Sequence, residues 1–414
     1  MTTRPPPAAS LIAALAAAFA AGGEPLPAQP HGLTAKPPDA FYDPPAKAPY
    51  RPGSLLRQEP LKGVSLPAGI RGWRILYTTT VNDRTPATAA ATVFTPVDPP
   101  PGPRPVITWA HGTTGLLQRC MPSLTSAPMV GVPAARRAAR EGWVIVATDY
   151  SFAEKDGPHP YLVGEGEARA ALDALRAARR MPELKLSPRT VVWGHSQGGH
   201  SALWTGIIAP RYAPELEVVG VAAIAPTANM PKIMALNPTL EKRLGPYLAK
   251  AYSRFYPDVD FDKAVRAEAL PAARRITELC DVLPPQDPAR IAELAASFEG
   301  PALTTRTDPA FRLRLAENAA YRPIAAPLLI IQGGADGVVP PAATQAYVEE
   351  RCAAGQRLEY WRFAGAGHGD IVRPGSPLEA PLADWTAARF AGAPHPNGCP
   401  QRDMPGRASV ERGR

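Results

Sequence analysis

Short apolar stretches alternate with helix-length amphipathic stretches along most of the chain beyond residue 70. Segments such as 105–110 and 190–193 are nearly continuous in apolar residues, which is typical of strands buried on both faces of a parallel sheet. Segments such as 165–180 instead repeat apolar residues at helical spacing. Strands separated by helix-length connections predict an α/β architecture, with a mainly parallel sheet covered by helices on both faces. The expected strands are 74–80, 88–95, 105–110, 143–148, 190–193, 218–224, 327–331 and 358–363, the first two forming an antiparallel pair, and the expected helices of this layer are 132–141, 165–180 and 200–208.

The interval 226–322 interrupts this alternation. It lies between two expected strands and has a mostly helical pattern, with helices expected at 239–254, 261–270, 272–282 and 289–298. A connection of this length is normally an inserted unit and not a plain loop. We therefore expect a helical cap at 226–322 over the carboxyl edge of the sheet, and a core made of 61–225 and 323–399.

The two ends of the chain differ from this core. Arg4 precedes an apolar stretch from Ala8 to Ala21, the pattern of a signal peptide over 1–21. That stretch is shorter than the roughly 20 apolar residues of a membrane span, so we expect no stable membrane insertion. Residues 22–60 form a proline-rich extension, and 400–414 are expected to be a disordered tail. The predicted localisation is secreted or periplasmic.

Cysteine usage and charge limit the possible functions further. The four cysteines are Cys120, Cys280, Cys352 and Cys399; an even count in an exported protein favours disulfides, and three pairings are open. None of them has the C-x-x-C spacing of a zinc site. The net charge of +8 comes from scattered basic residues, without the basic run that would indicate nucleic-acid binding.

The candidate nucleophile is Ser196, in the sequence Gly194-His195-Ser196-Gln197-Gly198. This G-x-S-x-G pattern places a serine on a tight strand-to-helix turn, where flanking glycines are needed because the backbone is strained and close to its neighbours. The context fits, since an apolar strand precedes the motif and a helical stretch follows it. Ser201 is a weaker candidate because it lies inside that helix.

A serine hydroxyl needs a base, which in this arrangement follows the serine and an acid in the chain. Of the seven histidines, His200, His368 and His395 follow Ser196. His200 is on the helix behind the turn, and His395 is in a proline-rich tail. His368 lies in a glycine-rich loop directly after a strand, so His368 is the predicted base.

Asp336 is the predicted acid, because it closes a buried strand and its glycine-rich turn at the carboxyl edge of the sheet. There it would orient the imidazole and stabilise the charged form of the base. Asp370 is an alternative, but it is only two residues from the histidine it would orient. Asp149 precedes the serine and is expected to be structural.

Backbone donors must stabilise the oxyanion of the tetrahedral intermediate. One is predicted to be the N–H of Gln197, the residue after the nucleophile. The other should come from His111-Gly112-Thr113-Thr114-Gly115, with Thr113 preferred and Gly112 second. His111 and His195 are expected to hold these loops by hydrogen bonds. The scheme uses neither a metal nor a cofactor.

Taken together and in this order, the 111–115 loop, the 194–199 motif, Gly333 to Pro340, and Gly367-His368 resemble the secretory lipase family of the α/β-hydrolase superfamily. The resemblance runs from about residue 40 to 400. It implies the α/β-hydrolase fold and hydrolysis of acylglycerols or similar lipid esters at a lipid–water interface without a cofactor. It also implies the disulfides Cys120–Cys280 and Cys352–Cys399, the first of which would tie the cap to the sheet. Independently of the resemblance, we expect a monomer.

Three other functions use the same residues or the same fold. An esterase for short-chain or aromatic esters would differ only in its pocket, and a secreted serine peptidase of this fold would use the same triad. A peptidase is disfavoured because the sequence has no propeller-like segment. A catalytically dead binding protein is disfavoured because the set Ser196, Asp336 and His368 is complete.

Overall fold

The computed structural model describes residues 34–46, 51–83, 85–152, 160–284, 286–305 and 308–406. The predicted signal peptide lies outside these residues. Within them, ten strands form one sheet in the order β1-β2-β3-β5-β4-β6-β7-β8-β9-β10. The strands are β1 (Leu55–Pro60), β2 (Ile70–Thr80), β3 (Pro86–Pro96), β4 (Arg104–Ala110), β5 (Val144–Phe152), β6 (Leu186–His195), β7 (Glu217–Ile224), β8 (Leu328–Gly333), β9 (Glu359–Phe363) and β10 (Gln401–Met404).

The sheet is mainly parallel, as predicted. Neighbouring strands from β5 to β10 pair in parallel, whereas β1, β2, β3 and β5 pair antiparallel. The long β2–β3 pair runs from Ile70 opposite Pro96 to Thr80 opposite Pro86. The middle strands are buried on both faces: every residue of β8 is buried.

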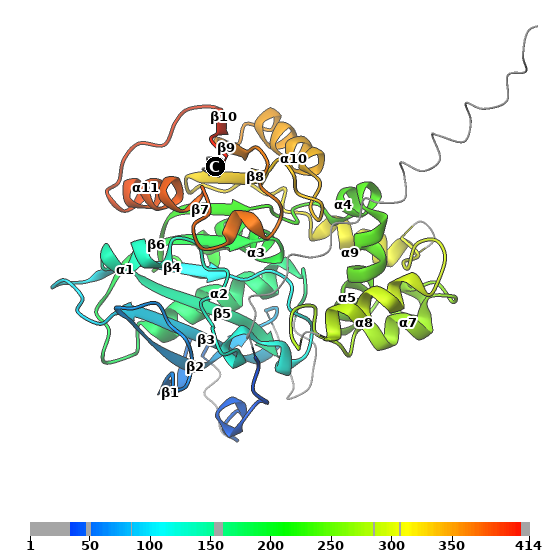
Figure 1. Ribbon diagram of the computed structural model, residues 1–414, viewed down its shortest axis with the longest axis horizontal. Coiled ribbons are helices and arrows are strands. Elements are labelled where there is room, and N and C mark those ends of the chain that lie inside the picture. Colours follow the sequence, from blue (N-terminus) through cyan, green and yellow to red (C-terminus); the bar gives the residue numbers. More distant parts are fainter. Residues whose placement is uncertain are drawn as a thin grey trace, which may run out of the picture.

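Helices cover both faces of the sheet, which gives three layers (Figure 1). One face packs against α2 (Gly164–Ala178), α3 (Gln197–Tyr212) and α10 (Pro341–Ala353), through side chains such as Leu172, Leu203 and Val348. The other packs against α1 (Ala135–Arg140) and α11 (Glu379–Phe390), through Ala138 and Leu382. Short 3-10 helices lie at Ala40–Tyr42, Gln118–Cys120, Pro122–Leu124 and Asp370–Val372.

Among the described residues between β7 and β8, six helices lie within the interval predicted for the cap and gather at one side of the molecule (Figure 1). They are α4 (Met230–Leu236), α5 (Pro238–Phe255), α6 (Phe261–Ala264), α7 (Leu270–Ile276), α8 (Gln286–Ala296) and α9 (Pro309–Glu317). They have an apolar core of their own, which continues into the sheet domain through Leu116, Tyr161 and Val339. The stretches 261–270 and 272–282 contain shorter helices than expected, α6 and α7.

The two disulfides implied by the family resemblance, Cys120–Cys280 and Cys352–Cys399, are both present. The first connects the loop after β4 to the cap, and the second connects α10 to the segment before β10.

Two predicted boundaries need correction. β1 (Leu55–Pro60) pairs with β2, so the sheet begins inside the predicted extension 22–60. The tail predicted as disordered over 400–414 begins with β10, whose residues Gln401–Met404 pair in parallel with β9. The exposed side chains of β10 give no apolar signal, and the strand instead follows the disulfide that brings Cys399 to α10.

Candidate active site

Ser196 occupies the turn between β6 and α3 with φ 58° and ψ −118°. A positive φ is strained for a residue other than glycine, and such strain is concentrated at functional sites. The flanking glycines make the turn possible: a Cβ on Gly194 would lie 1.9 Å from the carbonyl oxygen of Gly198, and a Cβ on Gly198 would lie 1.9 Å from that of Ala110. The motif therefore forms the strand-turn-helix expected from its sequence.

His368 and Asp336 form a hydrogen-bonded pair at the same edge of the sheet. The Nδ1–H of His368 donates to Oδ2 of Asp336 over 2.8 Å. The other carboxylate oxygen, Oδ1, accepts from the backbone N–H groups of Val338 at 2.9 Å and Val339 at 2.8 Å. Burial acts to raise the pKa of Asp336, but His368 and these hydrogen bonds outweigh it and hold the pKa below its ordinary value. The carboxylate is therefore charged beside the imidazole.

Two other histidines support these loops as neutral rings. The ring of His195 lies 4.5 Å from the ring of His368, and its Nε2–H donates to the carbonyl oxygen of His368 over 2.9 Å. The Nδ1–H of His111 donates to the carbonyl oxygen of Gly112 over 2.6 Å. Burial lowers the pKa of His111 to about 4, and burial together with His368 lowers that of His195 to about 3. Neither ring carries a charge at neutral pH.

The loop 111–115 lies directly against the candidate nucleophile. A Cβ on Gly112 would be 3.4 Å from Cβ of Ser196, so this glycine faces the serine across a gap that a methyl group would fill. Thr113 is held in this loop by a 2.9 Å hydrogen bond between its hydroxyl and that of Tyr161. Gln197 begins α3, where the first backbone N–H groups of a helix have no partner within the helix. The two predicted oxyanion donors thus lie on the two segments that flank Ser196.

One part of the site was missed from the sequence. Glu167 on α2 is fully buried, although only the apolar residues of this helix were predicted to face the core. Its Oε1 accepts from the side-chain amide of Gln197 over 2.8 Å, and its Oε2 lies 3.1 Å from Nδ1 of His200. The Nε2–H of His200 donates to the carbonyl oxygen of Asn318, at the end of the cap. This network fixes the residue after the nucleophile against both α2 and the cap.

A cavity of about 310 Å³ opens beside Ser196 and His368. Its wall is mostly apolar and comes from both parts of the chain, with Trp109, Met121, Ala147, Val338 and Val372 from the core and Leu240, Leu244, Val282 and Leu283 from the cap. The described residues contain no cluster of His, Cys, Asp or Glu arranged to hold a metal ion. Among their helices, none is long and apolar enough to cross a membrane.

Asp149 also lines this cavity, at the carboxyl end of β5. Its carboxyl group is almost fully buried and accepts from the backbone N–H of Ser123 over 3.1 Å. Burial raises the pKa of Asp149 to about 7. Between about pH 4 and about pH 7 the folded protein therefore keeps a proton that the unfolded chain has lost. The contribution of this group to stability falls as the pH rises through that window.

We expect Asp149→Asn to remove this pH dependence, because an amide does not titrate. Between pH 5 and pH 8 the variant should gain stability relative to the wild type by a few kcal/mol, measured as unfolding free energy in urea. Replacement of the exposed Asp98 by asparagine is the control. Equal pH slopes for the wild type and Asp149→Asn would contradict the prediction.

Comparison with known proteins confirms the resemblance to the secretory lipases: the model of the secretory lipase family matches residues 124–273. A probable inactive lipase of Mycobacterium tuberculosis is 26% identical over 386 residues, which cover 86% of this chain and 82% of the relative. A trichothecene C-3 esterase of Fusarium sporotrichioides is also 26% identical, over 397 residues with the same coverage. Lipase 6 of Candida albicans is 25% identical over 409 residues, or 88% of this chain and 84% of that lipase.

Solved structures confirm the fold. Candida antarctica lipase A superposes with a TM-score of 0.68 at 18% identity, covering 90% of each chain. The rice cell wall degrading esterase LipA of Xanthomonas oryzae superposes with a TM-score of 0.55 at 21% identity, covering 82% of this chain and 96% of the esterase. The predicted α/β-hydrolase fold, an open, mainly parallel sheet with helices on both faces, is confirmed.

Proposed function

We propose that this chain, which resembles the secretory lipases and has the α/β-hydrolase fold, is a secreted serine carboxylic ester hydrolase acting on lipid esters. The observation that carries the proposal is that His368, which is hydrogen-bonded to Asp336, lines the same cavity as Ser196, a serine on a strained turn. The lipases and the esterase among its relatives favour an ester substrate over a peptide. The two disulfides support export, and we expect the enzyme to act as a monomer.

In the proposed reaction, Ser196 attacks the ester carbonyl while His368 takes its proton, and Asp336 stabilises the resulting imidazolium. The backbone N–H groups of Gln197 and Thr113 donate to the oxyanion, each contributing on the order of 3 kcal/mol. His368 then protonates the departing alcohol and leaves an acyl group on Ser196. Water, activated by the same imidazole, releases the acid. Each step uses only protein groups and water.

The lining and the volume of the cavity indicate which esters would fit. Its apolar wall suits an acyl chain, which supports a lipase for acylglycerols. Its volume of about 310 Å³ is at the lower end of the range for small-molecule sites, and this favours an esterase for short-chain or aromatic esters as the second candidate.

Hydrolysis of p-nitrophenyl esters from acetate to palmitate tests the proposal, with Ser196→Ala as the background control. We expect turnover by the wild type that the control lacks. An optimum at long acyl chains would support the lipase, and one at acetate or butyrate the short-chain esterase. A folded wild-type protein that hydrolyses none of these esters would contradict the proposed function.

A further inference from the structure

The cap places a charged pair in the wall of the catalytic cavity. Arg243 on α5 and Asp281, in the segment after α7, both line the cavity that contains Ser196 and His368. Nη2 of Arg243 lies 3.2 Å from Oδ1 of Asp281, and their side chains are 16% and 13% exposed. Leu240 and Leu244, one turn or less from Arg243 on the same helix, are apolar and line the same wall.

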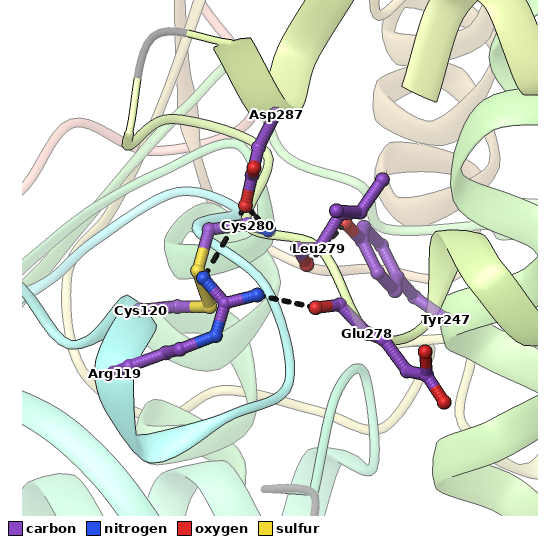
Figure 2. Close-up of a disulfide and its surroundings, with 7 residues drawn as sticks. All are labelled: Arg119, Cys120, Tyr247, Glu278, Leu279, Cys280 and Asp287. Carbon is purple, nitrogen blue, oxygen red and sulfur yellow. Dashed lines mark hydrogen bonds and ion pairs between the residues drawn. A yellow bond between two sulfur atoms is a disulfide. The ribbon is translucent and has the colours of Figure 1, made fainter. Parts of the chain in front are cut away.

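Asp281 is held in a fixed position relative to the loop beside the nucleophile. It directly follows Cys280. Cys280 forms a disulfide with Cys120, which lies in the segment after β4 (Figure 2). Gly115 and Cys280 pair as a β-bridge, and the backbone N–H of Asp281 donates to the carbonyl oxygen of Thr114 over 2.8 Å. Because Thr114 is next to Thr113, the backbone of Asp281 is tied to the predicted oxyanion loop.

Further contacts around the disulfide fix the cap side of this connection. Figure 2 shows the guanidinium of Arg119 between the two segments, donating to the carbonyl oxygen of Glu278 and pairing with Asp287 over 3.3 Å. Asp287 also accepts from the backbone N–H of Cys280 over 3.0 Å. The hydroxyl of Tyr247 on α5 donates to the carbonyl oxygen of Leu279 over 2.9 Å. The helix that bears Arg243 is thereby tied to the segment that bears Asp281.

Asp281 lines the same cavity as His368. Burial raises the pKa of Asp281 to about 6, while Arg243 and the nearby His368 act to lower it. Since the base of a serine hydrolase gives its proton to the departing alcohol, the alcohol part of an ester lies beside the histidine. Arg243 and Asp281 line the same cavity as His368, so they can border the space where that alcohol would sit.

A purely structural role does not explain such a pair in an apolar wall. Removing two charges from water costs several kcal/mol per ion, and replacing a buried ion pair by apolar residues of similar volume is often neutral or stabilising. A hydroxyl group can instead bind both side chains at once: its oxygen accepts a hydrogen bond from the guanidinium, and its O–H donates to the carboxylate. The position and the chemistry both indicate a hydroxylated ligand.

We propose that Arg243 and Asp281 form a polar subsite for the alcohol part of the substrate, so that the enzyme prefers esters of hydroxylated alcohols, such as partial acylglycerols, to esters of plain alkyl alcohols. This inference rests on the proposed ester hydrolysis at Ser196. The subsite lies in the cap, so it adds selectivity to a triad that belongs entirely to the core.

Two esters with the same acyl group test the subsite: glycerol 1-monobutyrate and n-propyl butyrate, both below saturation so that no interface forms. Their alcohols have the same carbon chain and differ in two hydroxyl groups. The measured quantity is the ratio of kcat/KM for the two esters, followed as acid release. The wild type is expected to prefer the monobutyrate. Asp281→Asn and Arg243→Met should each lower the ratio by roughly 10- to 100-fold, the range for losing a hydrogen bond to a charged group.

Two further variants separate selectivity from folding. Arg243→Met combined with Asp281→Leu removes both charges at once, leaves neither ion unpaired, and should lower the ratio in the same way. Arg290→Met removes an exposed ion pair with Glu293 on α8 and should keep the wild-type ratio. A ratio that stays at the wild-type value in all variants, with only the melting temperature reduced, would show a structural ion pair and overturn the subsite. A wild type that hydrolyses neither these two esters nor any of the p-nitrophenyl esters would overturn the proposed function itself, and the subsite with it.

Discussion

Replacing Ser196 with alanine should lower kcat for ester hydrolysis by roughly 10⁶-fold, the loss measured when a triad serine is removed from another serine hydrolase. The expected effect is this large because no other hydroxyl occupies the turn. The backbone of Ser196 has φ 58°, and the backbone packs so closely at Gly194 and Gly198 that no side chain would fit at either position. Steady-state kinetics on the preferred p-nitrophenyl ester would measure the loss, and circular dichroism would show that the fold is retained.

Ser201 provides a matched control on the same helix. It is fully buried within α3, one turn beyond the candidate nucleophile, and it was the alternative serine of the motif. Ser201→Ala should therefore keep activity near the wild-type level. If Ser201→Ala abolished activity and Ser196→Ala did not, the assignment of the nucleophile would be wrong. This test also matters because one relative is named a probable inactive lipase.

The strands of the sheet interior were predictable because their signal is strong and local. Val191, Val192 and Trp193 are completely buried, so both faces of their strand must be apolar and the sequence carries a continuous apolar run. The motif around Ser196 was predictable for a related reason, since the close contacts at Gly194 and Gly198 exclude any side chain. In both cases the sequence is constrained at every position.

The edge strands were missed because their stability comes from elsewhere in the chain. β1 is only partly buried, and three of the four residues of β10 are exposed. Their backbones gain hydrogen bonds from β2 and β9, and Cys399 is held beside α10 by its disulfide. Neither the backbone pairing nor the disulfide requires alternating apolar and polar residues in the sequence of the strand itself.

The polar residues around the site were missed for a different reason. Glu167, Arg243 and Asp281 are ordinary charged residues in sequence, and a charged residue on a helix usually faces solvent. Only the packing of α2 against α3, and of the cap against the loop after β4, brings them beside Gln197 and the cavity. Only Asp281 has a sequence feature nearby that indicates its position, because it directly follows Cys280, which was expected to form a disulfide.

Replacing Asp336 with asparagine should lower kcat by roughly 10⁴-fold with little change in the fold, as for the same replacement in another serine triad. The amide oxygen of asparagine can still accept from the N–H groups of Val338 and Val339, which keeps the turn in place. Its NH₂ group would then face Nδ1 of His368, where Oδ2 now accepts over 2.8 Å. A donor at that position favours the tautomer with its proton on Nε2, and such a ring cannot take the proton of Ser196.

Asp370→Asn separates this effect from a general loss of charge near the histidine. Asp370 is only two residues from His368, but its carboxylate is about half exposed and pairs with Arg373 over 2.7 Å. This variant should stay within a few-fold of the wild type in kcat, because an exposed ion pair contributes little and does not set the tautomer of the ring. The Asp336→Asn variant should recover part of its activity as the pH rises, since hydroxide can replace the missing base. If Asp370→Asn lost as much activity as Asp336→Asn, the acid of the triad would have to be reassigned to residue 370.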